Sequence, residues 1–196
     1  IVRLVGGIYV YDASTESFNK SGNSNCVNIM DFVDDGAGNL WMVSYTKGVY
    51  FYCRKDGNVK KYVRGKGNNE IGEMVSSPFL DESGGVWMIG RNANIYKYDS
   101  LTDSFLTYHQ IALPNMQNCS LLSALQSSNG HFWITSTVGL FDFDPQKRSL
   151  NMYTTNSGLL NNSFTSARKL SSGMFLFGSA DGFISIDSEK FSGNNR

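Results

Sequence analysis

The chain has 196 residues, with 17 basic and 17 acidic side chains, so its formal net charge is zero. This balance excludes the basic excess that nucleic-acid binding needs, and we expect no nucleic-acid contact. A hydrophobic content of 41% with 13% aromatic residues excludes a disordered chain. No apolar run reaches roughly 18 residues, which excludes a membrane-spanning helix within this sequence.

Cysteine and histidine are too few and too scattered to indicate a metal site. Cys26, Cys53 and Cys119 show no C-x-x-C spacing, and neither His109 nor His131 stands at ligand spacing from them. We therefore expect three packed or half-exposed thiols, no metal and no cofactor.

The first predicted element is a strand at residues 7–12, inside a truncated unit that spans residues 1–26. The N-terminus lacks an initiator Met and the basic segment of a signal peptide. Because the chain begins in the middle of a strand pattern, we expect it to be a piece of a longer protein.

The next unit, residues 27–70, is the first one that we expect to be complete. Aromatic and β-branched residues alternate or run for four to six positions and are bounded by Gly, Asn, Asp and Ser, which is typical of strands. No stretch of helical length shows a 3.6-residue apolar period. The four predicted strands lie at residues 27–33, 38–44, 48–52 and 59–63.

The same four-part pattern then recurs along the chain. It returns in residues 71–117 and 118–160, and in abbreviated form in residues 161–196. Three tryptophans mark the second strand of successive units, 46 residues apart: Trp41, Trp87 and Trp133. A glycine stands three residues before each of them: Gly38, Gly84 and Gly130.

Four short strands in every 43 to 46 residues indicate the blade of a propeller. The predicted fold is all-β: a partial β-propeller of about four four-stranded antiparallel blades, plus a truncated blade at the N-terminus. We expect Asp35 and Asp81 to accept backbone N–H groups in the turn before each tryptophan strand. The tryptophans and glycines are structural, and each tryptophan is expected to pack between blades.

The motif Asp35-x-x-Gly38-x-x-Trp41, with its copy ending in Trp87-Met88-Ile89-Gly90, resembles the two-component regulator propeller repeat. Residues 139–144 are similar to its second half, and residues 156–183 to its closing blade. The resemblance covers almost the whole chain. It implies the periplasmic sensor region of a hybrid two-component histidine kinase, tethered in the inner membrane outside this sequence, that senses a carbohydrate and signals to transcription.

A carbohydrate-active propeller enzyme, a hydrolase or a lyase, is the alternative function. Glycoside hydrolysis needs a carboxylate pair across a cleft. The carboxylates Asp99, Asp144 and Asp187 instead stand at recurrent strand ends, where we expect them to cap turns. We therefore expect no catalytic residues and no enzymatic turnover in this chain.

Candidate ligand-binding residues are those that break the repeat in the turn after each tryptophan strand. The resemblance implies small residues there, whereas this chain has Tyr45 and Lys47 in one turn and Arg91 and Asn92 in the next. An aromatic ring beside amide and guanidinium donors suits an oligosaccharide; a variable solvated loop is the alternative. His131 also departs from the pattern, and we expect it on a strand surface.

Self-association is the last expectation. An arc of four blades and a truncated one leaves an uncovered blade face at each end. Exposed apolar faces and unpaired strand edges favour pairing with a second copy.

Overall fold

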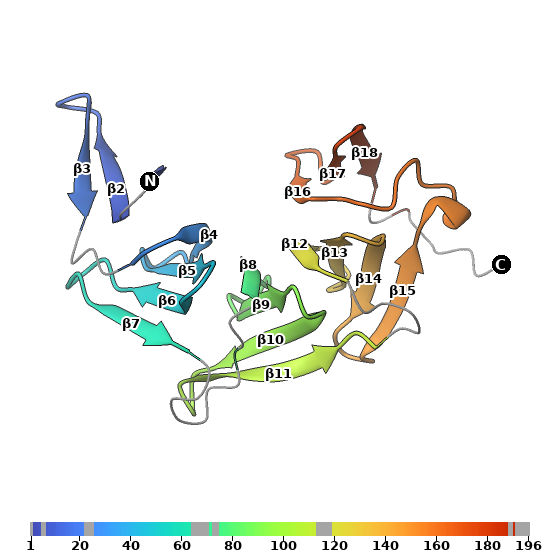
Figure 1. Ribbon diagram of the computed structural model, residues 1–196, viewed down its shortest axis with the longest axis horizontal. Coiled ribbons are helices and arrows are strands. Elements are labelled where there is room, and N and C mark those ends of the chain that lie inside the picture. Colours follow the sequence, from blue (N-terminus) through green and yellow to red (C-terminus); the bar gives the residue numbers. More distant parts are fainter. Residues whose placement is uncertain are drawn as a thin grey trace.

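The computed structural model describes residues 2–4, 7–21, 26–63, 71, 75–112, 119–187 and 190. They form five antiparallel sheets that follow one another along an arc, here numbered blades 1 to 5 (Figure 1). The predicted all-β partial propeller is confirmed. Besides strands, the described residues contain one short 3-10 turn, Thr155–Ser157, and no helix among them has the length and hydropathy needed to cross a membrane.

The strands of each blade pair in sequence order. Blade 1 holds β1 (Val2–Leu4), β2 (Gly7–Asp12) and β3 (Ser17–Ser21). Blade 2 holds β4 (Ile29–Asp34), β5 (Leu40–Ser44), β6 (Gly48–Tyr52) and β7 (Val59–Tyr62). Blade 3 holds β8 (Val75–Leu80), β9 (Val86–Gly90), β10 (Asn94–Asp99) and β11 (Ser104–Gln110). Blade 4 holds β12 (Leu121–Gln126), β13 (Phe132–Ser136), β14 (Leu140–Asp144) and β15 (Ser149–Tyr153), and blade 5 holds β16 (Ser166–Lys169), β17 (Phe175–Ser179) and β18 (Gly182–Ile186).

Blade 5 therefore has three described strands, in keeping with its abbreviated sequence. The predicted unit boundaries at residues 70 and 117 lie outside the described residues. Those at residues 26 and 160 fall between strands of neighbouring blades.

The first strand of each of blades 2 to 5 lies on the inner side of the arc (Figure 1). In blades 2, 3 and 4 this strand carries a β-bulge at the same place, before Asp31, Ser77 and Ser123. Ser76, inside one bulge, donates its hydroxyl to the Ile89 carbonyl at 3.0 Å and to the Leu121 carbonyl of the next blade at 2.5 Å. The bulge of blade 3 thus links that blade to blade 4 on the inner side of the arc.

The cores lie between blades, and each tryptophan occupies the same place in one of them. Trp41, Trp87 and Trp133 are 4%, 2% and 2% exposed. Trp41 meets Phe105 of blade 3 edge-on at 5.6 Å, and Trp87 meets Phe132 of blade 4 at 4.8 Å. Such aromatic pairs add about 0.5–1.5 kcal/mol beyond their buried area, so the interfaces are held by the repeat itself.

The aspartate turns before the Trp41 and Trp87 strands form as the sequence predicts, with Asp35 and Asp81 as acceptors. Asp81 Oδ1 accepts the N–H groups of Ser83 and Gly85 at 3.0 and 2.7 Å. Its Oδ2 accepts the indole N–H of Trp87 at 2.8 Å. Gly84 has a φ of 81°, a left-handed conformation that glycine adopts without strain. The turn therefore orients the tryptophan that follows it.

Candidate ligand-binding rim

The turns that join the second and third strands of a blade share one end of the propeller, here called the rim. They comprise residues 45–47, 91–93, 137–139 and 180–181. The turns that join first to second and third to fourth strands lie at the opposite end, because neighbouring strands are antiparallel.

A backbone hydrogen bond holds the first residue of the rim turn, and the same bond is found in blades 2 and 4. Tyr45 N–H donates to the Asn28 carbonyl at 3.0 Å in blade 2, and Thr137 N–H donates to the Ser120 carbonyl at 3.1 Å in blade 4. The side chain at this position is therefore presented from an ordered backbone. Arg91 occupies the same position in blade 3.

Tyr45 and Arg91, from neighbouring blades, are brought together by this arrangement. The guanidinium carbon of Arg91 lies 5.4 Å from the centre of the Tyr45 ring, within cation–π range. The Tyr45 side chain remains 59% exposed. The exposed Tyr45 ring and the guanidinium of the half-buried Arg91 thus lie side by side across the blade 2–blade 3 boundary.

The turn that carries Arg91 is braced on both sides. Ala93 N–H donates to the Gly90 carbonyl at 3.1 Å, and Ile111 N–H donates to the Ala93 carbonyl at 2.9 Å. Ser120 of blade 4 reaches the Arg91 carbonyl at 3.5 Å. These contacts hold the backbone, so Arg91 can reorient only through its side chain.

The other two predicted residues differ in availability. Lys47 is exposed in the same turn as Tyr45. Asn92 donates its side-chain amide to the Tyr96 hydroxyl at 3.1 Å, and Asn94 donates to the same oxygen at 3.0 Å. The Asn92 amide thus makes one hydrogen bond within its own blade, and the residue as a whole remains exposed.

Charge is distributed unequally between the described turns within blades at the two ends. Among the described rim-turn residues the charged ones are Lys47, Arg91 and Asp181, and Asp181 accepts the Asn161 amide at 2.5 Å. The opposite end holds most of the carboxylates in the described turns. Several accept hydrogen bonds within their own turns: Asp35, Asp56, Asp81, Asp99 and Asp144. Asp103 instead accepts the hydroxyl group of Tyr98. The rim of blades 2 and 3 therefore presents positive charge with no carboxylate in its turns.

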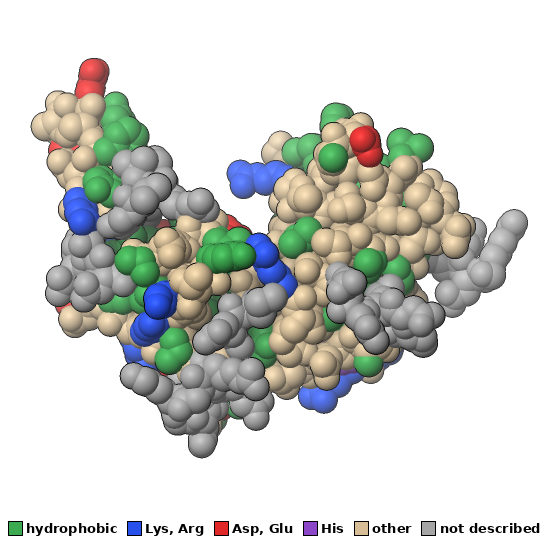
Figure 2. All heavy atoms as spheres, in the orientation of Figure 1, with side chains coloured by type: hydrophobic (Ala, Val, Ile, Leu, Met, Phe, Trp, Pro, Cys, Tyr) green, Lys and Arg blue, Asp and Glu red, His purple; other side chains and the backbone are tan. Residues whose placement is uncertain are grey.

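A groove of about 550 Å³ runs along the inner strands of blades 2 to 5. Figure 2 shows the molecule hollowed on the concave side of the arc, with Lys and Arg side chains beside the hollow. The groove is lined by side chains of both charges, among them Glu82, Arg168 and Lys169, and by the neutral Gln126. The groove and the rim residues named above do not overlap.

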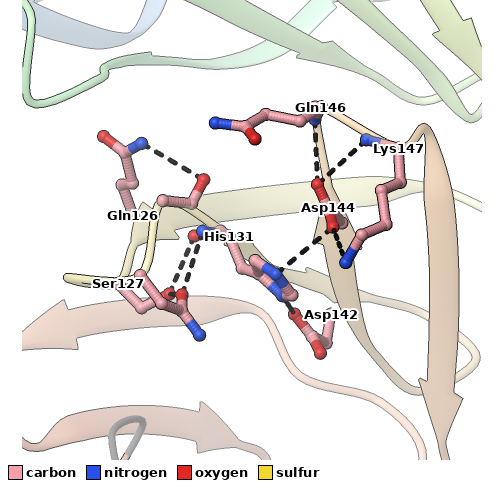
Figure 3. Close-up of polar contacts among 9 residues, drawn as sticks. Gln126, Ser127, His131, Asp142, Asp144, Gln146 and Lys147 are labelled. Atoms are coloured by element: carbon pink, nitrogen blue, oxygen red, sulfur yellow. Dashed lines mark hydrogen bonds and ion pairs between the residues drawn. The ribbon is translucent and has the colours of Figure 1, made fainter.

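A polar cluster at the opposite end of blade 4 surrounds His131, which lies just before β13 (Figure 3). Its Nδ1 is 2.8 Å from Asp142 Oδ1, and its Nε2 is 3.5 Å from Asp144 Oδ2. Asp144 also accepts the N–H groups of Gln146 and Lys147 at 2.9 and 3.1 Å, and these turn hydrogen bonds hold the pKa of its carboxyl below the ordinary value. His131 is thus half-buried and joined to β14 rather than lying free on a strand surface.

Two features of these sites escaped sequence reasoning. The acceptor of the recurrent rim-turn hydrogen bond is a backbone carbonyl. Because every residue type has this group, no sequence motif marks the bond. Asp142 occupies the position of Phe51 and Lys97, opposite the tryptophan of its blade. That departure from the repeat was a signal for the His131 pair.

No three His, Cys, Asp or Glu side chains within the described ranges are grouped so that they could hold a metal ion. The three cysteines are free thiols, and burial raises the pKa of Cys26 and Cys119.

Comparisons with solved structures identify the same architecture. The extracellular domain of the hybrid two-component system BT4673 from B. thetaiotaomicron matches with a TM-score of 0.76 and 17% identity, over 92% of this chain and 23% of that one. The corresponding domain of BT3049 from the same organism matches with a TM-score of 0.72 and 18% identity, over 92% of this chain and 25% of that one. PorZ, a surface component of the type-IX secretion system of Porphyromonas gingivalis, matches with a TM-score of 0.72 and 18% identity, over 97% of this chain and 30% of that one.

The fold is therefore the one that the sequence resemblance implied, that of the extracellular domains of hybrid two-component systems. This chain spans about a quarter of the length of those two chains. No family model matches the sequence, and no curated protein matches it. At these identities the likeness shows the fold alone, because propellers support unrelated functions.

Proposed function

We propose that this chain is a ligand-recognising part of the extracytoplasmic region of a hybrid two-component histidine kinase, and that its ligand is a carbohydrate. The observation that carries the proposal is the pairing of an exposed Tyr45 ring with the Arg91 guanidinium on anchored turns of adjacent blades. A ring face can stack on the C–H groups of a sugar, and a guanidinium can bind its oxygens.

The likeness to extracellular domains of hybrid two-component systems supports the sensory part of the proposal. In such an arrangement the propeller is periplasmic, and the membrane tether and kinase belong to other parts of the protein. Sequencing the gene downstream tests this directly. A histidine-kinase core following a membrane span is expected, and a glycosidase or lyase domain there would contradict it.

Glycan binding is tested with an oligosaccharide array, followed by calorimetry on each hit. Tyr45→Ala is expected to weaken binding about tenfold, which corresponds to about 1.4 kcal/mol. Tyr11→Ala is the matched control, since Tyr11 is 47% exposed but lies in blade 1. Equal loss in both variants would exclude the rim as the binding site.

We also propose that the chain does not turn over its ligand. The carboxylates Asp99 and Asp144 accept backbone N–H groups in their own turns, a structural role. A reducing-end assay on polysaccharides should show no release of sugar. Cleavage that is lost on changing a single carboxylate would establish the enzyme alternative instead.

A further inference from the structure

The rim residues also indicate the charge of the ligand. Tyr45 and Arg91 occupy the same repeat position, so one blade supplies the ring and the next supplies the cation. Lys47 adds a second cation in the Tyr45 turn. Within the described rim turns the single carboxylate, Asp181, belongs to blade 5 and is bound by Asn161. The cations of blades 2 and 3 therefore have no ion-pair partner among the described residues.

The contact with Tyr45 orients Arg91 without neutralising it. A ring accepts one face of the guanidinium plane, while the N–H groups in that plane stay free to donate. Such a planar fork matches a carboxylate or a sulfate ester better than it matches a single hydroxyl. Because the backbone of this turn is already held by hydrogen bonds, less conformational entropy is lost when a ligand binds.

We propose that the rim of blades 2 and 3 binds an anionic saccharide, with Arg91 on the acidic group, Lys47 adding charge and Tyr45 against the sugar ring. The inference rests on the carbohydrate ligand proposed above and narrows it to acidic sugars. Carboxylate and sulfate share this chemistry, and the probes must distinguish them.

The experiment uses three probes on a common galactose backbone: galactotriose, trigalacturonate and a sulfated galactose trisaccharide. Calorimetry on the full chain should show at least one acidic probe binding about tenfold or more tightly than galactotriose. The difference should shrink as salt is added, because exposed charges are screened. Whichever acidic probe binds identifies the anionic group.

Arg91→Gln should reduce the affinity for the acidic probe about tenfold and leave that for galactotriose nearly unchanged. Arg148→Gln is the matched control: Arg148 stacks on Tyr108 at 4.8 Å, a second Arg–Tyr pair at the opposite end. Arg91→Lys retains the charge without the fork and should be intermediate. Thermal unfolding of each variant confirms that it is folded.

The inference is overturned if neither acidic probe binds more tightly than galactotriose, or if Arg91→Gln and Arg148→Gln behave alike. Amide NMR shifts that avoid residues 45–47 and 90–93 on titration with the acidic probe would also overturn it. If neutral glycans from the array bind while acidic ones do not, the anionic ligand is excluded and the carbohydrate function stands. If no glycan binds, the carbohydrate function itself fails.

Discussion

The repeated tryptophan is the residue on which the blade interfaces depend. Trp41, Trp87 and Trp133 each lie in an apolar cluster that includes residues of the next blade. Replacing any one with Ala should lower the free energy of unfolding by about 3–5 kcal/mol. Urea denaturation followed by tryptophan fluorescence and circular dichroism measures each loss. A loss below about 1 kcal/mol at one position would show that its interface is not cooperative with the others.

Asp81 gives the stability of blade 3 a dependence on pH. Burial pushes the pKa of its carboxyl upward, but hydrogen bonds from Ser83, Trp87 and Gly85 outweigh this and leave the pKa below its ordinary value. The folded state thus favours the ionised form. Its contribution is present above the unfolded pKa, near 4, and is lost as pH falls through the lower folded value.

The corresponding measurement compares the unfolding free energy of the wild type and Asp81→Asn between about pH 2 and pH 7. The difference should be largest near neutrality and should shrink in acid. Ser127→Ala is the control, because blade 4 has Ser127 at the equivalent turn position and no carboxylate to titrate there. A difference that grows toward low pH would contradict the assignment.

At the scale of the element, the glycine that opens the third strand is required by close packing. Gly48 has a φ of 81°, and a Cβ there would run into the Tyr62 carbonyl oxygen of β7. Gly139 meets the Tyr153 carbonyl of β15 in the same way. Blade 3 has Asn94 at this position, and its β10–β11 pairing contains a bulge between Ile95 and Tyr96.

Gly48→Ala should therefore destabilise the chain more than Gly36→Ala. Gly36 has a similar φ of 79°, but a Cβ there meets nothing within 4 Å. Gly36→Ala carries only the left-handed penalty of about 1–2 kcal/mol, whereas Gly48→Ala adds a clash with backbone. Equal unfolding midpoints for the two variants would show that β7 moves aside at little cost.

Much of the blade could be predicted from the sequence, since tryptophan, glycine and turn aspartate recur at fixed spacing and each has a distinct physical role. The rim residues were found because they break that spacing. Their juxtaposition was not predictable: Tyr45 and Arg91 are distant in sequence, and their approach depends on the rotation from blade 2 to blade 3. The His131–Asp142 pair likewise depends on the register between β13 and β14.

At the scale of the whole molecule, we expect self-association. Blades 1 and 5 stand at the two ends of the arc, so in the 196-residue chain each has one face that no other described blade covers (Figure 1). Phe18 and Phe183 are 49% and 72% exposed on these end blades. Sedimentation at micromolar concentration should reveal a dimer or larger species.

Phe183→Ser should shift that equilibrium toward monomer. Leu101→Ser is the control, since Leu101 is 95% exposed in a turn of blade 3, away from both ends of the arc. A monomer at all concentrations, or an equal response to the two substitutions, would rule out association through the blade ends.

The hydrogen bond that holds the first residue of a rim turn involves backbone atoms alone, so it does not depend on the side chain at that position. The anchoring N–H and carbonyl belong to the backbone, and the bond forms with both Tyr45 and Thr137 at that position. Arg91 stands at the same position in blade 3. In the site proposed above, we therefore expect that substitution at one position per blade changes the ligand preference while the blade stays intact. On this proposal, the specificity of the propeller depends on the order of side chains at one position in successive blades along the arc, and it can change without loss of stability.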